Sequence, residues 1–182
     1  MGTVTLQTKR LYLRPWCEGD AEALYRWASD SQIGPAAGWP PHTSAENSRE
    51  IIGSVLSEPG TFAVVRKDGG ADVPVGSVGV FPADIAEASG EPELGYWIAR
   101  PLWGQGLIPE AVEELLRWQF CEKGAERVWC AHFEGNDKSR RVIEKCGFTY
   151  VCTGPEQCWP DGSYRASRYY AITRQEWEVR HG

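Results

Sequence analysis

The stretch Glu93-Leu-Gly-Tyr-Trp-Ile-Ala-Arg-Pro-Leu-Trp-Gly-Gln-Gly-Leu-Ile-Pro-Glu-Ala111 decides the fold, because it predicts a strand, a glycine turn and the start of a helix. Gly104 and Gly106 bracket one residue, so the backbone can bend tightly there and lie close to a ligand. Pro109 suits the first position of a helix, where a missing N–H costs nothing. Such a helix would direct its free N–H groups and the positive end of its dipole at the turn. We therefore expect a phosphate-bearing ligand.

Two common phosphate-binding motifs do not fit this turn. A mononucleotide P-loop ends in Gly-Lys-Ser/Thr, whereas this chain has Gly106-Leu-Ile108, with neither a lysine nor a hydroxyl group. A dinucleotide fingerprint needs a third glycine three residues after Gly106, and that residue is Pro109. A turn that binds a pyrophosphate through backbone amides alone remains.

Two motifs together resemble the GNAT acyltransferases, in particular the branch of the RimJ and RimL ribosomal-protein N-terminal acetyltransferases. They are Trp103-Gly-Gln-Gly-Leu-Ile-Pro-Glu-Ala111 and Asn136-Asp-Lys-Ser-Arg-Arg-Val-Ile-Glu-Lys-Cys-Gly-Phe148. The opening Thr8-Lys-Arg-Leu-Tyr-Leu-Arg-Pro15 and the segment Gly38-Trp-Pro-Pro-His-Thr43 also look like that branch. The resemblance runs from about residue 8 to Trp177. One departure is Pro101, where the broad family often has Arg or Gln.

The predicted elements follow the order that the resembled family has. Hydrophobic periodicity and turn residues predict strands at 9–14, 61–66, 75–81, 94–99, 127–133, 148–153 and 167–173, and helices at 18–29, 44–56, 108–123 and 137–145. The Gly/Pro-rich segment 34–41 and the acidic segment 82–92 are expected to be loops. We expect an α/β chain of mixed α+β type, with the GNAT acyl-CoA N-acyltransferase fold: a mixed, mostly antiparallel sheet flanked by helices.

Length and composition limit the class of protein. With 182 residues, we expect one GNAT domain over residues 1–182. The net charge of −6 argues against a nucleic-acid binder and suits a cationic amine substrate. The six cysteines form no CxxC pair and the three histidines lie near no cysteine pair, so we expect reduced thiols and no metal. Without an apolar run or a signal-like start, the chain is expected to be cytoplasmic, with no membrane contact.

The resemblance implies acetyl transfer from acetyl-CoA to an amine by direct attack in a ternary complex. The strand end would hold the pantetheine arm through its main chain, the turn would hold the pyrophosphate, and a later segment would contact the cofactor's amide-bearing arm. These cofactor-binding residues are Trp97, Ile98, Ala99, Trp103, Gly104, Gln105, Gly106, Leu107, Ile108, Asn136 and Ser139. Ser139 could also protonate the leaving thiolate. Alternatively, Asn136 and Ser139 only cap the helix 137–145.

Glu93 is the expected general base, because it matches the position where several family members keep a carboxylate. The alternatives are an exposed acid at the strand end, the neighbouring Glu91, and His132, which could titrate near neutral pH or be structural. Trp39 and His42 would border the acceptor cleft or belong to a rigid connector. The acidic residues of the segment 82–93 could steer a cationic amine or form a solvated surface; they are Asp84, Glu87, Glu91 and Glu93.

The acceptor stays open at this point. The branch resemblance favours a protein N-terminal α-amine, whose pKa of about 7.7–8.0 demands less of a base than a lysine at about 10.4. A small amine such as a polyamine or drug, or another acyl-CoA, is the alternative. A non-catalytic acyl-CoA-binding sensor would keep the turn without a working acid and base. The aromatic-rich segment 148–172 would suit a homodimer.

Overall fold

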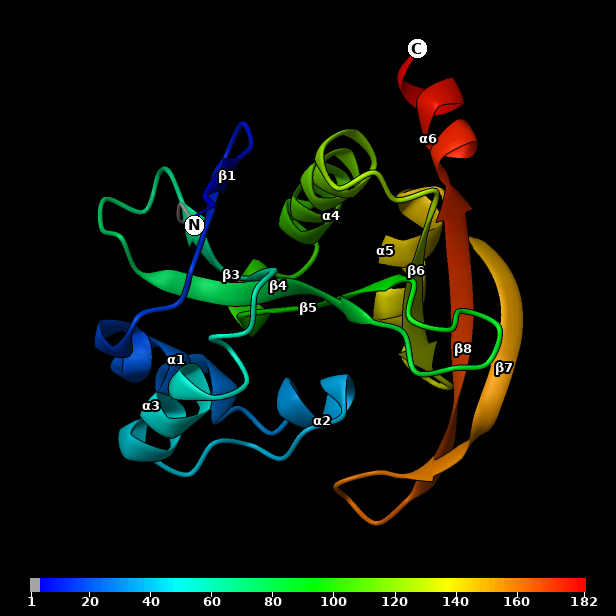
Figure 1. Cartoon of the computed structure of the whole chain (residues 1–182). Helices are drawn as coiled ribbons and strands as arrows, with labels where there is room; N and C mark the ends of the chain where they lie inside the picture. Colours follow the sequence, from blue (N-terminus) through cyan, green and yellow to red (C-terminus); the bar gives the residue numbers. More distant parts are fainter. Residues whose placement is uncertain (1–3) are drawn as a thin grey trace. The chain divides into compact units, whose positions relative to one another are not determined.

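The computed structural model describes residues 4–182, which fall into two compact units. Of the described residues, the first unit contains 4–79 and Tyr96–Ala111, and the second contains Val80–Gly95 and Val112–Gly182. Among the described residues, eight strands form one sheet in the order β1-β2-β3-β4-β5-β6-β8-β7 (Figure 1). The β5–β6 pair is parallel, and the other pairs with an assigned register are antiparallel. The expected mixed, mostly antiparallel sheet is confirmed.

The first unit contains the antiparallel strands β1 (Leu6–Gln7), β2 (Leu11–Arg14), β3 (Thr61–Arg66) and most of β4 (Pro74–Pro82). Alternation along β2 buries Leu11 and Leu13 completely and leaves Tyr12 exposed, as the period-two pattern predicts. The last three residues of β5 (Pro92–Ile98) also belong to this unit, followed by a 3₁₀ turn at Arg100–Leu102.

The first unit contains three helices, α1 (Ala21–Ala28), α2 (Gly34–Ala37) and α3 (Ala45–Gly53). Helices α1 and α3 pack against each other (Figure 1). Buried residues of α1 and α3 form a core with Trp16 and with Ala63 of β3. Ser44 caps α3, since its hydroxyl accepts a hydrogen bond from Asn47 N at 3.0 Å. The expectation of a loop throughout 34–41 was wrong: α2 forms there, because Pro35 starts a helical turn and Gly38, at φ 93°, ends it.

The second unit contains β6 (Arg127–Phe133), β8 (Tyr164–Thr173) and β7 (Thr149–Cys158), together with the first part of β5. Its β5–β6 pairing places Glu93 opposite Trp129 and Leu94 opposite Cys130. The closing strands extend further than predicted, to Cys158 and back from Tyr164, because each continues into the hairpin that joins them. Ala83 and Ala88 of the acidic segment pack on Trp129, Tyr169 and Ala171.

Helices α4 (Leu107–Arg117), α5 (Asp137–Lys145) and α6 (Arg174–His181) complete the fold. The single helix predicted over 108–123 changes to a π-helix at Trp118–Glu122 before Gly124, at φ 75°. Pro109 is the third residue of α4, not the first as expected; its missing N–H still costs nothing, because the first four N–H groups of a helix have no partner within it. Helix α6 was not predicted.

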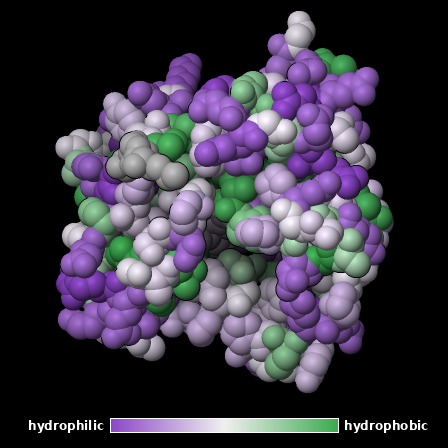
Figure 2. All heavy atoms as spheres, viewed as in Figure 1, coloured by the Kyte–Doolittle hydropathy of each residue, from purple (hydrophilic) through white to green (hydrophobic). Residues whose placement is uncertain are grey.

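Hydrophilic residues cover much of the face drawn in Figure 2, with apolar residues scattered among them. Within residues 4–182, no helix is both long and apolar enough to cross a membrane. The same described residues hold no cluster of three or more His, Cys, Asp or Glu side chains that could bind a metal ion. All six cysteines are free thiols.

Candidate active site

The glycine turn lies between the 3₁₀ turn Arg100–Leu102 and the start of α4, entirely within the first unit. Gly104 and Gly106 have φ values of 77° and 73°, a left-handed backbone that favours glycine over other residues. None of the hydrogen bonds among the described residues uses the N–H groups of Gly106, Leu107 or Ile108. A Cβ added at Gly104 would meet no heavy atom within 4 Å, so this side of the turn is open. The turn therefore presents main-chain donors at a helix N-terminus, as predicted.

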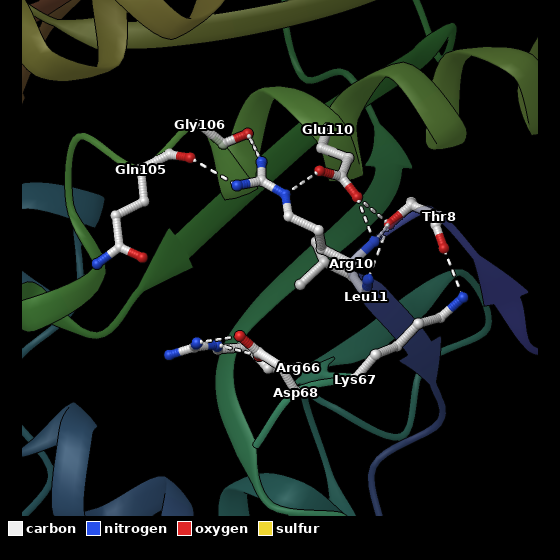
Figure 3. Close-up of polar contacts among 9 residues, drawn as sticks. All are labelled: Thr8, Arg10, Leu11, Arg66, Lys67, Asp68, Gln105, Gly106 and Glu110. Atoms are coloured by element: carbon white, nitrogen blue, oxygen red, sulfur yellow. Dashed lines mark hydrogen bonds and ion pairs between the residues drawn. The ribbon is translucent and has the colours of Figure 1, made fainter. Parts of the chain in front are cut away.

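Arg10 binds this turn from the residue just before β2 (Figure 3). Its Nη1 donates to the Gln105 carbonyl at 3.0 Å, and its Nη2 donates to the Gly106 carbonyl at 3.1 Å. Its Nε donates to a carboxylate oxygen of Glu110 at 2.6 Å. Neither Arg10 nor Glu110 was predicted as a site residue. The sequence motif Thr8–Pro15 drew attention to this segment, but no local pattern indicates that Arg10 reaches a turn near residue 105.

At the end of β5, two main-chain groups have hydrogen-bond partners within the protein. The Ile98 carbonyl accepts a hydrogen bond from the Trp103 indole at 2.9 Å. The Ala99 N–H donates to the Val75 carbonyl at 2.8 Å. These two groups are therefore occupied within the protein, which restricts the contacts that Trp97–Ala99 could make with a pantetheine arm. The Trp103 indole thus connects the turn to β5 through a hydrogen bond.

Trp39 and His42 do come together with Trp97 in the first unit. The Trp39 ring centroid is 5.9 Å from that of Trp97 in an edge-on arrangement, and 5.3 Å from that of His42. His42 Nδ1 lies 2.8 Å from the Ser48 hydroxyl, and burial lowers the pKa of His42. Near neutral pH the imidazole is accordingly uncharged, and with the two indoles it forms an aromatic cluster beside the end of β5.

Glu93 is half-buried on β5 in the second unit. Burial, followed by the negative charge of Asp84, raises the pKa of Glu93 from 4.5 to about 7. No hydrogen bond contributes to this shift. The charge of Glu93 also adds to the raised pKa of Tyr169, of which burial is the main cause. A carboxyl group that exchanges its proton near neutral pH is suited to acid–base chemistry.

The two alternative bases have structural partners. Glu91 forms an ion pair with Arg127 at 2.7 Å and accepts a hydrogen bond from the Trp129 indole; the bond to Arg127 is the main reason its pKa is lowered. His132 is buried, with Nδ1 2.8 Å from the Phe133 carbonyl and Nε2 3.2 Å from the Tyr170 hydroxyl. Both ring nitrogens are thus engaged, as in a structural histidine.

Asn136 is the N-cap residue of α5, and its side-chain oxygen accepts a hydrogen bond from the Ser139 N–H at 3.1 Å. This geometry is the capping arrangement that the sequence left as an alternative to cofactor binding. The Ser139 N–H uses one lone pair of the Asn136 side-chain oxygen. Because an amide oxygen has two lone pairs, the cap alone does not decide between the two roles.

Comparison with known proteins places these features in a family. The acetyltransferase (GNAT) domain matches residues 10–149. The chain therefore belongs to the GNAT acetyltransferase domain family, a class of acyltransferase enzymes.

Relatives and solved structures agree with this membership. Over 95 residues, the chain is 32% identical to YdaF of Bacillus subtilis, to which a ribosomal N-acetyltransferase activity is ascribed; the match covers 52% of each chain. It is 34% identical over 87 residues to the FsC-acetyl coenzyme A-N(2)-transacetylase of Aspergillus fumigatus, covering 47% of this chain and 37% of that protein. Thus the chain matches about half, or less, of the length of these relatives. A GNAT-family acetyltransferase from Bacillus anthracis shares the fold, with a TM-score of 0.79, 24% identity, and coverage of 94% of this chain and 99% of that one.

Proposed function

We propose that this chain is an acetyl-CoA-dependent N-acetyltransferase that transfers the acetyl group to a primary amine by direct attack in a ternary complex. The observation that carries the proposal is the glycine turn at the N-terminus of α4, with main-chain N–H groups that no other part of the described chain binds. Membership of the GNAT family and a relative named for acetyl coenzyme A support the same donor.

The residues of the turn fit the pyrophosphate of acetyl-CoA. Two glycines with positive φ leave the backbone uncovered, and the open space beside Gly104 is where any other residue would carry a Cβ. The N–H groups of Gly106, Leu107 and Ile108 would donate to phosphate oxygens, aided by the helix dipole. When bound, acetyl-CoA supplies the activated acetyl group; a metal ion has no role in this proposal.

Glu93 would take the proton from the amine. A carboxyl group with a pKa of about 7 is close to half deprotonated near neutral pH, so it can accept a proton without a large energetic cost. A peptide α-amine, with a pKa of about 7.7–8.0, is already partly uncharged there. This match favours a protein N-terminal α-amine over a lysine side chain as the acceptor. The ribosomal activity ascribed to YdaF supports it too.

The remaining predicted site residues take secondary roles in this proposal. Ser139 would pass a proton to the leaving thiolate and regain one from water, and Asn136 would hold the amide-bearing arm of the cofactor. The cluster of Trp39, His42 and Trp97 would border the acceptor with an uncharged aromatic surface. We further propose that residues 1–182 act as one GNAT domain, since the family match includes residues of both units.

The cellular location, the oligomeric state and the charge of the acceptor are predicted from the sequence alone. A cytoplasmic location and a homodimer through the aromatic-rich segment 148–172 stay predictions, and light scattering of the purified chain would test the second. The acidic segment with Asp84 and Glu87 would favour a cationic acceptor, so basic peptides are the first choice for a screen.

The test is a thiol-release assay with acetyl-CoA and a panel of peptides with free N-termini, N-terminally blocked peptides carrying lysine, and polyamines. We expect free CoA with the first group and identification of the acetylated α-amine by mass spectrometry. Release only with polyamines would change the acceptor to a small amine. Tight binding of acetyl-CoA without formation of free CoA in the presence of any amine would contradict the proposed catalytic activity. That result would favour an acyl-CoA sensor.

A further inference from the structure

Arg10 makes more contacts with the glycine turn than any expected site residue. Its guanidinium donates to two consecutive carbonyls, those of Gln105 and Gly106, and its Nε donates to Glu110 in the first helical turn of α4 (Figure 3). The planar fork of an arginine can form such a set only in one orientation, whereas a lysine ammonium cannot reproduce it.

Arg10 is itself held in place. Glu110 accepts hydrogen bonds from the Arg10 main-chain N–H at 2.8 Å and from the Thr8 hydroxyl, in addition to the side-chain ion pair. The Thr8 oxygen also accepts from the Leu11 N–H at 2.9 Å, which fixes this group to the start of β2. The result is a connected network from β2 to the turn, although the Arg10 side chain is 44% exposed. Within it, Arg10, Glu110 and Thr8 are each bonded to at least two other members, so the three side chains restrict one another.

The two carbonyls determine where the following N–H groups point. In a trans peptide, the carbonyl of one residue and the N–H of the next lie on opposite sides of the bond. By binding the Gln105 and Gly106 carbonyls, Arg10 directs the N–H groups of Gly106 and Leu107 away from itself. The Gly106 carbonyl also accepts a hydrogen bond from the Glu110 N–H at 3.3 Å, so the peptide after Gln105 depends more on Arg10 than the peptide after Gly106 does. These are two of the donors proposed for the pyrophosphate.

The charge of Arg10 is less important than its shape. The positive charge is already paired with the Glu110 carboxylate, which lies 2.6 Å from Nε. A role through charge alone would leave the affinity for a phosphate ligand little changed when lysine replaces arginine. If the guanidinium geometry is what matters, replacing arginine with lysine should lower the affinity for a phosphate ligand.

We propose that Arg10 is a positioning residue for acyl-CoA binding, whose guanidinium fixes the two carbonyls so that the N–H groups of Gly106 and Leu107 face the pyrophosphate. This inference rests on the proposed function, because it assumes that the turn binds a CoA compound.

The test compares Arg10→Lys with Arg66→Lys. Arg66 lies on β3 opposite Leu11, and it pairs with Asp68 on the surface without contact to the turn, so it is a matched control (Figure 3). The affinity for acetyl-CoA is measured by calorimetry, and turnover is measured with S-acetylpantetheine, a donor without the pyrophosphate. For Arg10→Lys we expect acetyl-CoA affinity to fall roughly tenfold, the effect of misdirecting one or two hydrogen bonds. Turnover with S-acetylpantetheine should stay near that of the wild type, and Arg66→Lys should match the wild type in both.

Two results would overturn the positioning role. Unchanged acetyl-CoA affinity in Arg10→Lys would show that the fork is not needed, and an equal loss with both donors would indicate general damage to the fold. If Arg10→Lys does not fold, Thr8→Val, which keeps the arginine, should show a smaller loss confined to acetyl-CoA, and no loss would again overturn it. A wild-type chain that binds no CoA compound would instead contradict the proposed function.

Discussion

Glu93 is half-buried on β5, and this burial is the main cause that raises its pKa to about 7. Since a general base acts in its deprotonated form, kcat/KM should rise with pH through the pKa of Glu93, about 7, and rise further as the peptide α-amine loses its proton at about 7.7–8.0. Asp84→Asn removes a negative charge that raises this pKa, so the rising limb should move to lower pH. The measurement is the pH profile of kcat/KM for the wild type, Asp84→Asn and Glu93→Gln, with peptide as acceptor.

The Glu93 prediction has a clear contrary outcome. If the limb keeps its position in Asp84→Asn, or if Glu93→Gln retains wild-type kcat/KM, another group or water takes the proton. Glu87→Gln is a suitable control, because that charge lies on the same acidic segment and does not contribute to the shift of Glu93.

Gly104 shows how a single backbone angle supports the turn. At φ 77°, an alanine would be strained by about 1–2 kcal/mol, although its Cβ would meet no atom of the protein. We expect Gly104→Ala to lower the free energy of unfolding by about that amount and to weaken acetyl-CoA binding further, because the Cβ enters the open side of the turn. Gly53→Ala, at the end of α3 with equally open space, should be neutral or stabilising by about 0.5–1 kcal/mol. Urea unfolding and calorimetry check both; equal effects of the two variants would contradict the argument.

Strand β4 approaches the end of β5 so closely that Gly76 leaves no room for a side chain. A Cβ there would lie 2.4 Å from the Trp97 carbonyl oxygen and 2.9 Å from the Ile98 Cα, both main-chain atoms that cannot rotate away. We expect Gly76→Ala to destabilise the protein by about 1–3 kcal/mol or more, as overpacking does. Gly79→Ala in the same strand, with its nearest contact at 3.4 Å, should cost much less. Denaturant unfolding compares them, and similar losses would show that the contact with β5 is not the cause.

The elements that could be predicted are those with signals inside their own sequence. Helix α5 begins and ends where expected because Asn136 caps it and Gly147, at φ 85°, follows it. Strand β6 also has its predicted bounds. Helix α6 carried a signal that was missed, since Thr173 and Glu176 form a capping box in the structure. The π-helix at Trp118 has no such local signal, and its residues fit the apolar stripe of an ordinary helix.

The features of the candidate site also differ in whether a local sequence signal predicts them. The glycine turn was predictable because positive φ and the helix start both leave marks in the local sequence. The Arg10 network was not, because its partners Gln105, Gly106 and Glu110 lie far along the chain. Likewise, the occupation of the Ile98 carbonyl by Trp103 and the raised pKa of Glu93 depend on tertiary packing, which a sequence pattern does not record.

For the chain as a whole, two segments far apart in the sequence are proposed to contact the cofactor: the turn Gly104–Ile108, and Asn136 with Ser139. If both sets bind acetyl-CoA, adding it should slow amide hydrogen exchange at Gly104–Ile108 and at Asn136–Ser139 together. Desulfo-CoA should protect the same segments, whereas ATP, which lacks the pantetheine arm, should leave Asn136–Ser139 unprotected. Exchange reports such local openings directly, since ligand binding shifts them by mass action.

The exchange experiment also decides the open question about Asn136. Protection confined to the turn would mean that Asn136 and Ser139 only cap α5, as the 3.1 Å hydrogen bond between them is sufficient to do. Asn136→Asp is the matched variant, because aspartate keeps the capping oxygen and removes the amide donor. If Asn136 holds the cofactor arm through its amide N–H, this variant should keep its thermal stability and lose acetyl-CoA affinity. Unchanged affinity would leave the second unit with Glu93 as its proposed contribution to the reaction.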